Sequence, residues 1–462
     1  MIEGLEPYAE YKESGQKWLG QVPRQWTSFP LCRIATPKSE CGRTDLELLS
    51  VYLHRGVIRY ADSGGQVHKP SLDLSKYQVV APGDFVLNNQ QAWRGSIGVS
   101  KFQGIISPAY VVLKLSPNLN PDYANYLFRS PAMVAQFVTA SRGVGDIQRN
   151  LFYPDLRNSI AIVPPPDEQA AIVRFLDHAN RKIDGFIRAK RKLIGLLNEQ
   201  KQAIIHRAVT RGLDPDVKLR PSGIPWLGDI PKHWEVTRIK YLLREVDNRS
   251  SMGKEPLLSM RMHHGLVVFA EHFTRPPQAA TLVGFKIVRP RQFVVNRMQA
   301  GNGVIFPSCL DITGLVSPDY AVFDPIADVN VDYLGELFRT GALRVKFRSE
   351  SKGLGTGTSG FMRLYNDRFG AIHIALPPRK EQDEILKGIG EQSADINTAI
   401  ARTEREIALM QEYRTRLTSD IVTGKLDVRE AAAKLPDLPT EPAGEALTDE
   451  ALDDSETEDA EA

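Results

Sequence analysis

The sequence predicts an α+β chain in which two tandem, diverged α+β domains are separated by two long helices that pair as an antiparallel coiled coil. Three observations predict this fold class. One repeat spans nearly all of the 462 residues, each copy begins with short β-rich runs and turns, and each copy ends in a long stretch with apolar residues at helical spacing.

The repeat keeps its order along the chain, and its offset drifts only from 208 to 213 residues. Ser14–Trp26 (SGQKWLGQVPRQW) returns as Ser222–Trp234 (SGIPWLGDIPKHW), and the Glu-Gln dipeptide of Val163–Val173 returns in Leu376–Leu386. Chance similarity does not preserve order and spacing over such a length. The chain is therefore a duplication.

The first part of each copy is predicted to be a globular α+β domain. We call these parts head 1 (about residues 14–163) and head 2 (about residues 222–376). Residues 77–87 and 285–295 each predict a strand, a proline turn and a second strand. The later YLFR and ELFR motifs fall in predicted helices.

The second part of each copy is predicted to be a long helix. Prolines precede both stretches, Gly212 and Gly424 follow them, and residues 167–211 contain no proline. Apolar residues spaced three and four apart place one stripe along each helix. The stripe comprises Ile172, Leu176, Ile183, Ile187, Ile194 and Leu197 in the first helix, and Ile385, Ile389, Ile396, Ile400, Ile407 and Leu417 in the second.

A helix of this length extends roughly 68 Å, too far for its stripe to be buried against one small domain. The two helices are therefore expected to pair as a coiled coil, and the short connector Leu213–Ser222 favours the antiparallel arrangement. The predicted domains are residues 1–165, 166–212, 213–378, 379–426 and an acidic, disordered tail, 427–462.

The net charge of +2 hides a basic body. Residues 435–462 contain 11 acidic and no basic residues, so residues 1–434 carry 58 Lys and Arg against 45 Asp and Glu, a net charge of +13. Such a body suggests a polyanionic partner such as nucleic acid. Two similar heads held apart by paired helices predict a protein that contacts two separated half-sites on duplex DNA. Because the heads have diverged, the two half-sites are expected to differ in sequence.

Composition excludes several classes of protein. No run of 18 apolar residues and no secretory signal occur, so we expect a cytoplasmic protein without a membrane span. Three cysteines, Cys32, Cys41 and Cys309, without CxxC spacing favour reduced thiols over a disulfide framework or a zinc site. We expect no metal site in this chain.

The repeated start SG…WLG.(I/V)P..W and the segment PPPDEQAAIVRFLDHANRKIDGFI, with its weaker second copy, resemble the specificity (S) subunit of type I restriction–modification systems from about Glu10 to Arg429. The resemblance implies that each head is a target recognition domain for one half of an asymmetric, split DNA site. It also implies that the helices bind two adenine-N6 methyltransferase (M) subunits, which restriction (R) subunits join. No cofactor would bind this chain, and S-adenosylmethionine, ATP and Mg²⁺ would belong to the partner subunits. Asn397 departs from the pattern, because the first copy has Asp184 there.

The loop after the strand pair is the candidate base-reading element. Asn and Gln suit adenine, and Arg suits guanine; an ordinary polar surface loop is the alternative. The candidates are Asn88, Asn89, Gln90, Gln91 and Arg94 in head 1, and Asn296, Arg297, Gln299 and Asn302 in head 2.

A second pair of loops is the candidate for DNA-backbone contacts, because glycine lets the main chain approach phosphate and basic side chains can clamp it. A solvated flexible loop is the alternative. The candidates are Arg142, Gln148 and Arg149 in head 1, and Lys352, Thr358 and Arg363 in head 2.

Other motifs favour structural interpretations. The paired tryptophans Trp18/Trp26 and Trp226/Trp234 recur with fixed neighbours, which favours packing over base stacking. His263-His264 is interpreted as a surface or DNA-facing pair rather than a metal site. The GxGxxG pattern at residues 355–360 neither follows a strand nor opens a helix, so we reject a dinucleotide site.

The rival class is a fused recognition enzyme. An amino-methyltransferase should carry an [N/D/S]PP[Y/F] tetrapeptide, and a motor should carry GxxxxGK[ST]; neither occurs. We therefore predict a non-catalytic chain without catalytic residues.

Overall fold

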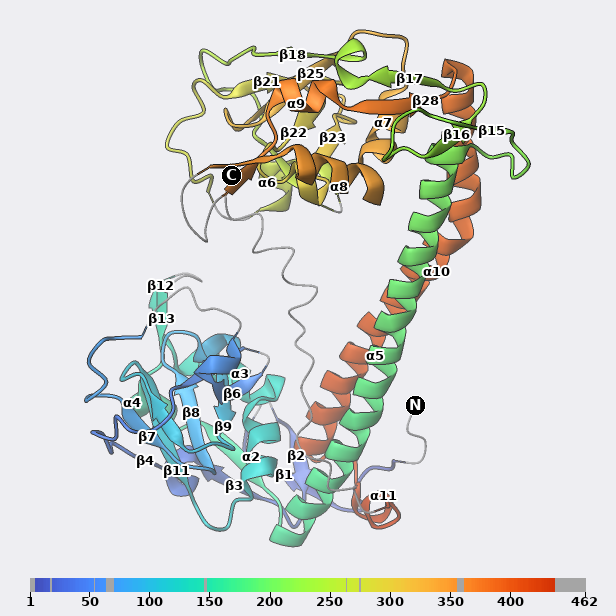
Figure 1. Cartoon of the computed structure of the whole chain (residues 1–462). Helices are drawn as coiled ribbons and strands as arrows, with labels where there is room; N and C mark the ends of the chain where they lie inside the picture. Colours follow the sequence, from blue (N-terminus) through green and yellow to red (C-terminus); the bar gives the residue numbers. More distant parts are fainter. Residues whose placement is uncertain are drawn as a thin grey trace. The chain divides into compact units, whose positions relative to one another are not determined.

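The computed structural model describes residues 5–16, 19–53, 55–63, 70–144, 148–262, 264–273, 276–354 and 361–436. The chain divides into two compact units (Figure 1). The division falls after Arg191 in one long helix and after Thr403 in the other, so each unit contains one head and parts of both helices.

Both heads are built on the same four-stranded antiparallel sheet. In head 1 its order is β4 (Ala35–Pro37), β11 (Tyr110–Leu115), β8 (Asp84–Asn88) and β9 (Ile97–Val99). In head 2 the order is β18 (Leu243–Val246), β25 (Ala321–Pro325), β22 (Phe293–Val295) and β23 (Ile305–Pro307). The duplication predicted from the sequence is thus repeated in the strand order.

Smaller antiparallel strand pairs complete each head. Head 1 has β1 (Tyr11–Glu13) with β2 (Gln21–Pro23), β3 (Thr27–Pro30) with β14 (Ile160–Val163), β5 (Leu49–Tyr52) with β6 (Gly56–Arg59), β7 (Gln78–Val80) with β10 (Gly104–Ile106), and β12 (Arg142–Val144) with β13 (Gln148–Asn150). The counterparts in head 2 are β15 (Leu219–Pro221) with β16 (Asp229–Pro231), β17 (Glu235–Arg238) with β28 (His373–Leu376), β19 (Leu258–Arg261) with β20 (Gly265–Val268), β21 (Lys286–Val288) with β24 (Gly314–Val316), and β26 (Lys352–Leu354) with β27 (Phe361–Arg363).

The strand, proline turn and strand predicted in each head are confirmed as β7–β8 and β21–β22. The two strands of each pair do not bond to one another. β7 pairs with β10, whereas β8 pairs with β9 and β11. The proline turn therefore carries the chain from one sheet into the next.

Two helices follow the central sheet in each head, and the first of them begins at a capping asparagine. α2 (Pro121–Phe128) and α7 (Val331–Phe338) are capped by Asn120 and Asn330, whose side chains accept bonds from the first helical N–H groups. α3 (Pro131–Ala140) and α8 (Gly341–Glu350) come next. Short helices elsewhere are α1 (Leu31–Ile34), α4 (Tyr153–Leu156), α6 (Phe269–His272), α9 (Asn366–Ala371) and α11 (Arg429–Ala433).

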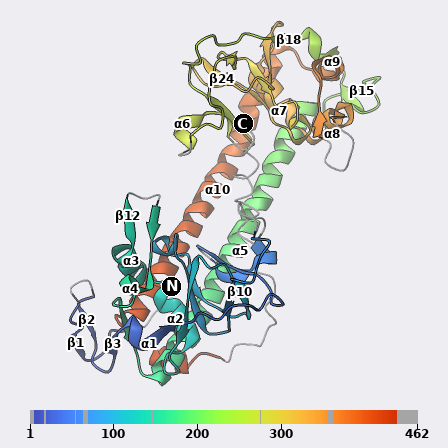
Figure 2. The ribbon, with the colours of Figure 1, turned by 90° about the vertical axis from the view of Figure 1, so that its left-hand side faces the viewer.

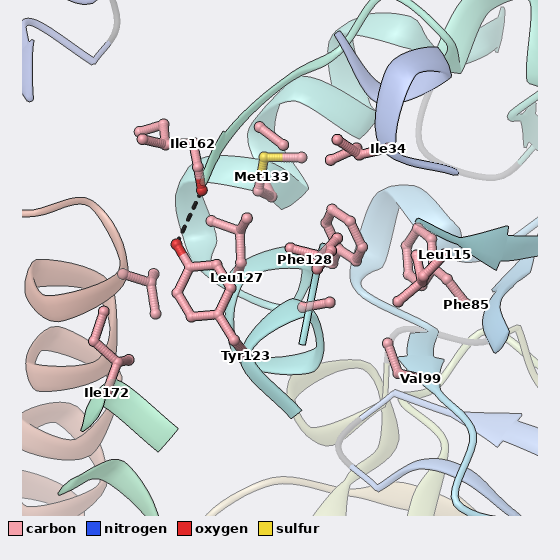
Figure 3. Packing of buried hydrophobic residues seen from close by; sticks show 14 of the residues in the cluster. Ile34, Phe85, Val99, Leu115, Tyr123, Leu127, Phe128, Met133, Ile162 and Ile172 are labelled. Carbon is pink, nitrogen blue, oxygen red and sulfur yellow. Dashed lines mark hydrogen bonds between the residues drawn. The ribbon is translucent and has the colours of Figure 1, made fainter. Parts of the chain in front are cut away.

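The core of head 1 is continuous with the start of the first long helix, α5 (Pro166–Arg211) (Figure 3). Phe85 and Phe128 stack with ring centroids 4.2 Å apart. The buried Tyr123 hydroxyl donates to the carbonyl of Ile162 at 2.9 Å, and Ile172 of α5 belongs to the same cluster. Head and helix therefore share one apolar core.

The Glu-Gln dipeptide of each repeat joins a head to its helix. In head 1, Gln169 accepts a hydrogen bond from Asn120 N at 2.7 Å and donates to Pro164 O at 2.9 Å. In head 2, Gln382 accepts from Asn330 N at 2.8 Å and donates to Pro377 O at 2.9 Å. The buried amide thus ties the cap of α2 or α7 to the first turn of the long helix.

The two long helices, α5 and α10 (Arg379–Val422), pair antiparallel, as Figures 1 and 2 show. Asp184 pairs with Arg414, Lys190 contacts Glu406 at 2.6 Å, and Lys201 donates to Asn397 at 2.8 Å. Residue numbers rise along α5 as they fall along α10. The predicted fold class, two tandem α+β domains separated by an antiparallel helix pair, is confirmed.

The predicted apolar stripe is most deeply buried where the helices meet the heads. Half-buried positions follow along the rest of the pair, because there the helices cover only one another. The buried members are Ile172, Leu176, Ile183, Ile187, Ile385, Ile389, Ile396 and Leu417, and the half-buried ones are Ile194, Leu197, Ile400 and Ile407.

The structure corrects the expected start of the disordered tail. Residues 427–436 are ordered, because Val428 and Ala432 are buried in the core of the head 1 unit. Asp427 N also donates to Glu6 O at 2.8 Å, which fastens this segment to the N-terminal strand region. Residues 437–462 lie outside the described residues.

Candidate nucleic-acid interface

The loop after β8 or β22 has the same backbone in both heads. In head 1 it forms a short 3₁₀ helix, η2 (Ala92–Arg94), closed by Gly95 at φ 100°. In head 2 it forms η4 (Ala300–Asn302), closed by Gly303 at φ 90°. Glycine adopts this left-handed conformation without the steric cost of a Cβ atom. Side chains at matching loop positions therefore start from equivalent backbone.

An asparagine at the start of each loop holds this conformation. Asn88 Oδ1 accepts a hydrogen bond from Gln90 N at 3.1 Å, and Asn296 Oδ1 accepts one from Met298 N at 3.1 Å. Side-chain oxygens commonly close turns in this way. The amide oxygen of each asparagine thus already accepts a hydrogen bond within its loop.

Each loop lies beside the hairpin that carries the predicted DNA-backbone contacts. Leu151 N donates to Asn89 O at 2.9 Å in head 1, and Leu364 N donates to Arg297 O at 2.9 Å in head 2. The β12–β13 hairpin protrudes from the body of head 1 in both views (Figures 1 and 2). The two candidate elements, which lie far apart in the sequence, are neighbours in each head. The side chain of Gln148 and the whole of Thr358 lie outside the described residues.

In head 1 two candidate arginines lie near one indole ring. The guanidinium carbons of Arg94 and Arg149 lie 4.6 Å and 5.7 Å from the ring centroid of Trp93. Trp93 Nε1 donates to Gln90 O at 2.9 Å, which fixes the ring on the loop. Cation–π contacts of this kind hold guanidinium groups in place.

Arg142 and Lys352, at matching ends of the two hairpins, are both exposed. The Arg142 side chain is 71% exposed and bonds to Asp155 at 2.5 Å. Exposed cationic side chains on a protruding hairpin can reach phosphate. Breaking the Arg142–Asp155 ion pair to do so would cost little free energy, because surface ion pairs are weak.

In head 2 two arginines converge on one aspartate. Arg297 Nε donates to the carbonyl of Asp319 at 2.9 Å, and the Arg363 guanidinium lies 3.8 Å from its carboxylate. Burial, followed by the positive charge of Arg363, lowers the pKa of Arg297. This local excess of positive charge favours an approaching acceptor or anion.

The helix behind the head 2 loop adds to this charge. Arg348 of α8 donates to Gly301 O at 3.2 Å and to Asn302 Oδ1 at 3.2 Å. Asn302 donates in turn to Gln299 Oε1 at 2.6 Å. α8 (GALRVKFRSE) also carries Arg344 and Lys346, whereas α3 (PAMVAQFVTA) has no charged residue. The two heads therefore present different electrostatic surfaces on one backbone.

Comparison with the sequence prediction identifies two positions that it missed, Trp93 and Asn150. The recurrence of the other tryptophans in both copies predicts packing, and the burial of Trp26 and Trp234 confirms it for those two. Trp18 is outside the described residues. Trp93 in head 1 corresponds to Gly301 in head 2. This difference between the two copies is the sequence signal that could have identified Trp93. Nothing in the sequence places Asn150 beside Asn89.

A cavity of about 250 Å³ lies elsewhere in the head 2 unit. It is lined by the end of α5, the Trp226 segment, the end of α7 and the start of α8, including His206, Leu337 and Leu343. None of the candidate DNA-contacting residues lines it.

No group of three potential metal ligands occurs among the described residues. His263 is outside them, and the ring of His264 lies 6.1 Å from that of His272. None of the helices within the described ranges is long and apolar enough to cross a membrane.

Comparisons with known proteins point to one family. No family model matches the chain. The chain is 24% identical over 391 residues to a Methanocaldococcus jannaschii protein assigned as the type I restriction enzyme MjaX specificity subunit, covering 77% of this chain and 81% of that protein.

Two solved structures are similar. One comes from a study of complex assembly and conformational transition in a type I restriction–modification system. Its TM-score is 0.58 at 14% identity, covering 88% of this chain and 99% of that chain. The other is the HsdS subunit from Thermoanaerobacter tengcongensis, with a TM-score of 0.39, 15% identity, and coverage of 88% and 98%. The resemblance predicted from the repeated motifs is therefore confirmed: this chain resembles the specificity subunits of type I restriction–modification systems.

Proposed function

We propose that this chain is the sequence-specific DNA-binding subunit of a type I restriction–modification complex, and that each head reads one half of an asymmetric, bipartite site. The observation that carries the proposal is the loop-and-hairpin pair. Its backbone is the same in both heads, whereas its side chains differ. Head 1 carries Asn89 where head 2 carries Arg297, and their carbonyls accept matching hydrogen bonds. Equivalent geometry with changed hydrogen-bonding groups suits two readers of different half-sites.

The charge distribution supports DNA as the ligand. Residues 1–434 have a net charge of +13, and arginines occur on the loop, the hairpin or both in each head. Neutralising phosphates with such side chains releases counterions, which drives binding and makes it salt-dependent.

The helix pair is proposed to act as the spacer between the two readers and as the platform for two methyltransferase subunits, to which restriction subunits are added. Exposed leucines support a partner along the helices. Leu193 and Leu196 of α5 are 39% and 53% exposed, and Leu409 of α10 is 64% exposed. Apolar side chains left in solvent on a charged helix favour burial against another protein.

In this proposal the chain itself is non-catalytic. Methyl transfer would use S-adenosylmethionine bound by the methyltransferase subunits, and ATP and Mg²⁺ would act in the restriction subunits. The rival proposal, a fused recognition enzyme, predicts instead that the purified chain alone transfers methyl groups.

The direct experiment is methylation-site sequencing of genomic DNA from a host that expresses the full chain with its methyltransferase subunit. We expect one adenine-methylated motif made of two short specified blocks separated by unspecified bases. The methyltransferase subunit without the chain is the matched control and should give no such motif. A single contiguous motif, or methylation by the chain alone, contradicts the proposal.

A further inference from the structure

One pair of positions joins the loop to the hairpin in each head. In head 1 these are Asn89, whose carbonyl accepts from Leu151 N, and Asn150, the residue before Leu151. In head 2 they are Arg297, whose carbonyl accepts from Leu364 N, and Arg363. Both hydrogen bonds measure 2.9 Å. The two pairs therefore occupy the same place on the same backbone.

The chemistry of the pair changes completely between the heads. Head 1 presents two amides, and head 2 presents two guanidinium groups. A third position changes with them: Asp319, which both arginines approach, corresponds to Ala109 in head 1. The turn is the same in both copies, since Ala109 N and Asp319 N each bond to a serine hydroxyl two residues earlier at 3.4 Å. Of the two heads, the one with the two arginines has an aspartate at this position, and the one with the two asparagines has an alanine.

Each pair also contains a polar atom that lacks a partner. Asn89 Oδ1 in head 1 and Arg363 Nε in head 2 are shielded from solvent and make no hydrogen bond with the described residues. A buried polar atom left unpaired costs about 1–3 kcal/mol. Such an atom calls for an explanation, and a ligand that supplies the missing partner is one.

We propose that this pair determines the difference between the two half-sites: Asn89 and Asn150 read adenine of an A·T pair, and Arg297 and Arg363 read guanine of a G·C pair. This inference rests on the proposed function. An amide pairs in a bidentate way with adenine N6 and N7, and a guanidinium pairs in the same way with guanine O6 and N7. The inference assigns base reading to Arg363 and adds Asn150 to the reading surface.

A sequence-independent phosphate clamp is the competing role for the arginines. Two observations favour base reading. First, the main-chain carbonyl of Asp319 accepts a hydrogen bond from Arg297, and the Asp319 carboxylate lies 3.8 Å from the Arg363 guanidinium. An oriented guanidinium serves bidentate recognition better than point-charge attraction does. Second, the uncharged amides of Asn89 and Asn150 cannot replace such a clamp in head 1, although the backbone there is the same.

The test exchanges the whole triad in the full chain, assembled with its methyltransferase subunits. The variant R297N/R363N/D319A carries the head 1 side chains in head 2, and N89R/N150R/A109D carries the reverse. Binding is measured by selection from a randomised duplex library followed by sequencing. Arg289→Asn, at the exposed turn before β22, is the matched control at the other end of the same strand.

We expect the first variant to lose its guanine preference in one half-site by roughly tenfold or more and to gain adenine there, while the other half-site stays unchanged. The reciprocal variant should change only the opposite half. The unchanged half reports that each variant is folded. Arg289→Asn should leave both halves as in the wild type.

The outcomes separate the two proposals. A wild-type complex that selects no split motif refutes the proposed function. A split wild-type motif whose second half contains no G·C pair overturns the pair assignment alone. Uniformly weaker binding of the first variant to all sequences, with an unaltered motif, would show that the arginines clamp phosphate and would likewise overturn it.

Discussion

Trp26 Nε1 donates a hydrogen bond to Glu168 Oε1 at 2.8 Å, and the equivalent Trp234 Nε1 donates to Glu381 Oε1 at 3.0 Å. Each glutamate lies in the first turn of the long helix that follows its head. The same indole rings lie against Gly424 and Gly212, which end the other long helix of their unit. One tryptophan therefore ties the head to the start of one helix and to the end of its antiparallel partner.

Replacing Glu168 with alanine should destabilise the chain by about 2–4 kcal/mol, because the buried Trp26 indole and Tyr8 hydroxyl both lose their acceptor. Urea unfolding followed by tryptophan fluorescence measures the loss. Glu430→Ala removes a glutamate that is 85% exposed and should change stability little. Equal losses in the two variants would contradict the structural role of Glu168.

Asn397→Asp should strengthen the helix pair by up to about 1 kcal/mol, because it turns the hydrogen bond with Lys201 into an ion pair. Asp184 and Arg414 occupy the matching repeat positions and form such a pair. The gain, measured by thermal unfolding, should fade at high salt. A gain of the same size in a Lys201→Gln background would mean that the ion pair is not its cause.

Arg142→Ala and Lys352→Ala should each weaken DNA binding by the full complex equally for all sequences, because the role proposed for these exposed hairpin cations is contact with phosphate, which carries no sequence information. Each substitution should also reduce the slope of log affinity against log salt by about one. Binding titrations at several salt concentrations, on cognate and unrelated duplexes, test this. A selective loss on cognate DNA would reassign these side chains to base reading.

Alkylation of Cys309 should be slow near neutral pH. Partial desolvation of its sulfur, with the carboxylate and hydrogen bond of Asp332, raises its pKa from 9.0 to about 11. Only the thiolate reacts, so the rate should rise roughly tenfold per pH unit up to pH 11. Asp332→Asn should lower the pKa and speed the reaction, as iodoacetamide labelling and mass spectrometry would show. A rate that levels off near pH 9 would be inconsistent with this environment.

The long helices could be predicted from the sequence because their signals are local. Prolines stand at their starts, and Gly212 and Gly424 at their ends adopt φ of 79°, a conformation in which other side chains are strained. The repeat added a second copy of every signal. The strand runs around the proline turns were equally local, and both pairs of strands are present in the structure.

The composition of the interface could be predicted only in part, because it depends on long-range packing. The bond between Leu151 and Asn89 joins residues that no periodicity relates, so the sequence does not place Asn150 beside the candidate loop. Likewise, Val428 is ordered because the segment around Glu6 and Tyr8 packs on it, and composition alone suggested a disordered tail. Local sequence patterns predict helices and strands, whereas the contacts between these elements become visible only in the folded structure.

The most direct test of two independent readers is a chain in which residues 222–376 also replace residues 14–163, so that head 2 is present twice on an intact helix pair. Methylated-motif sequencing of this variant, with its methyltransferase subunits, should show two blocks that specify the same bases, one of them identical to a wild-type half-site. If the motif stays asymmetric, or if the untouched half also changes, the heads do not read their half-sites separately and the account fails.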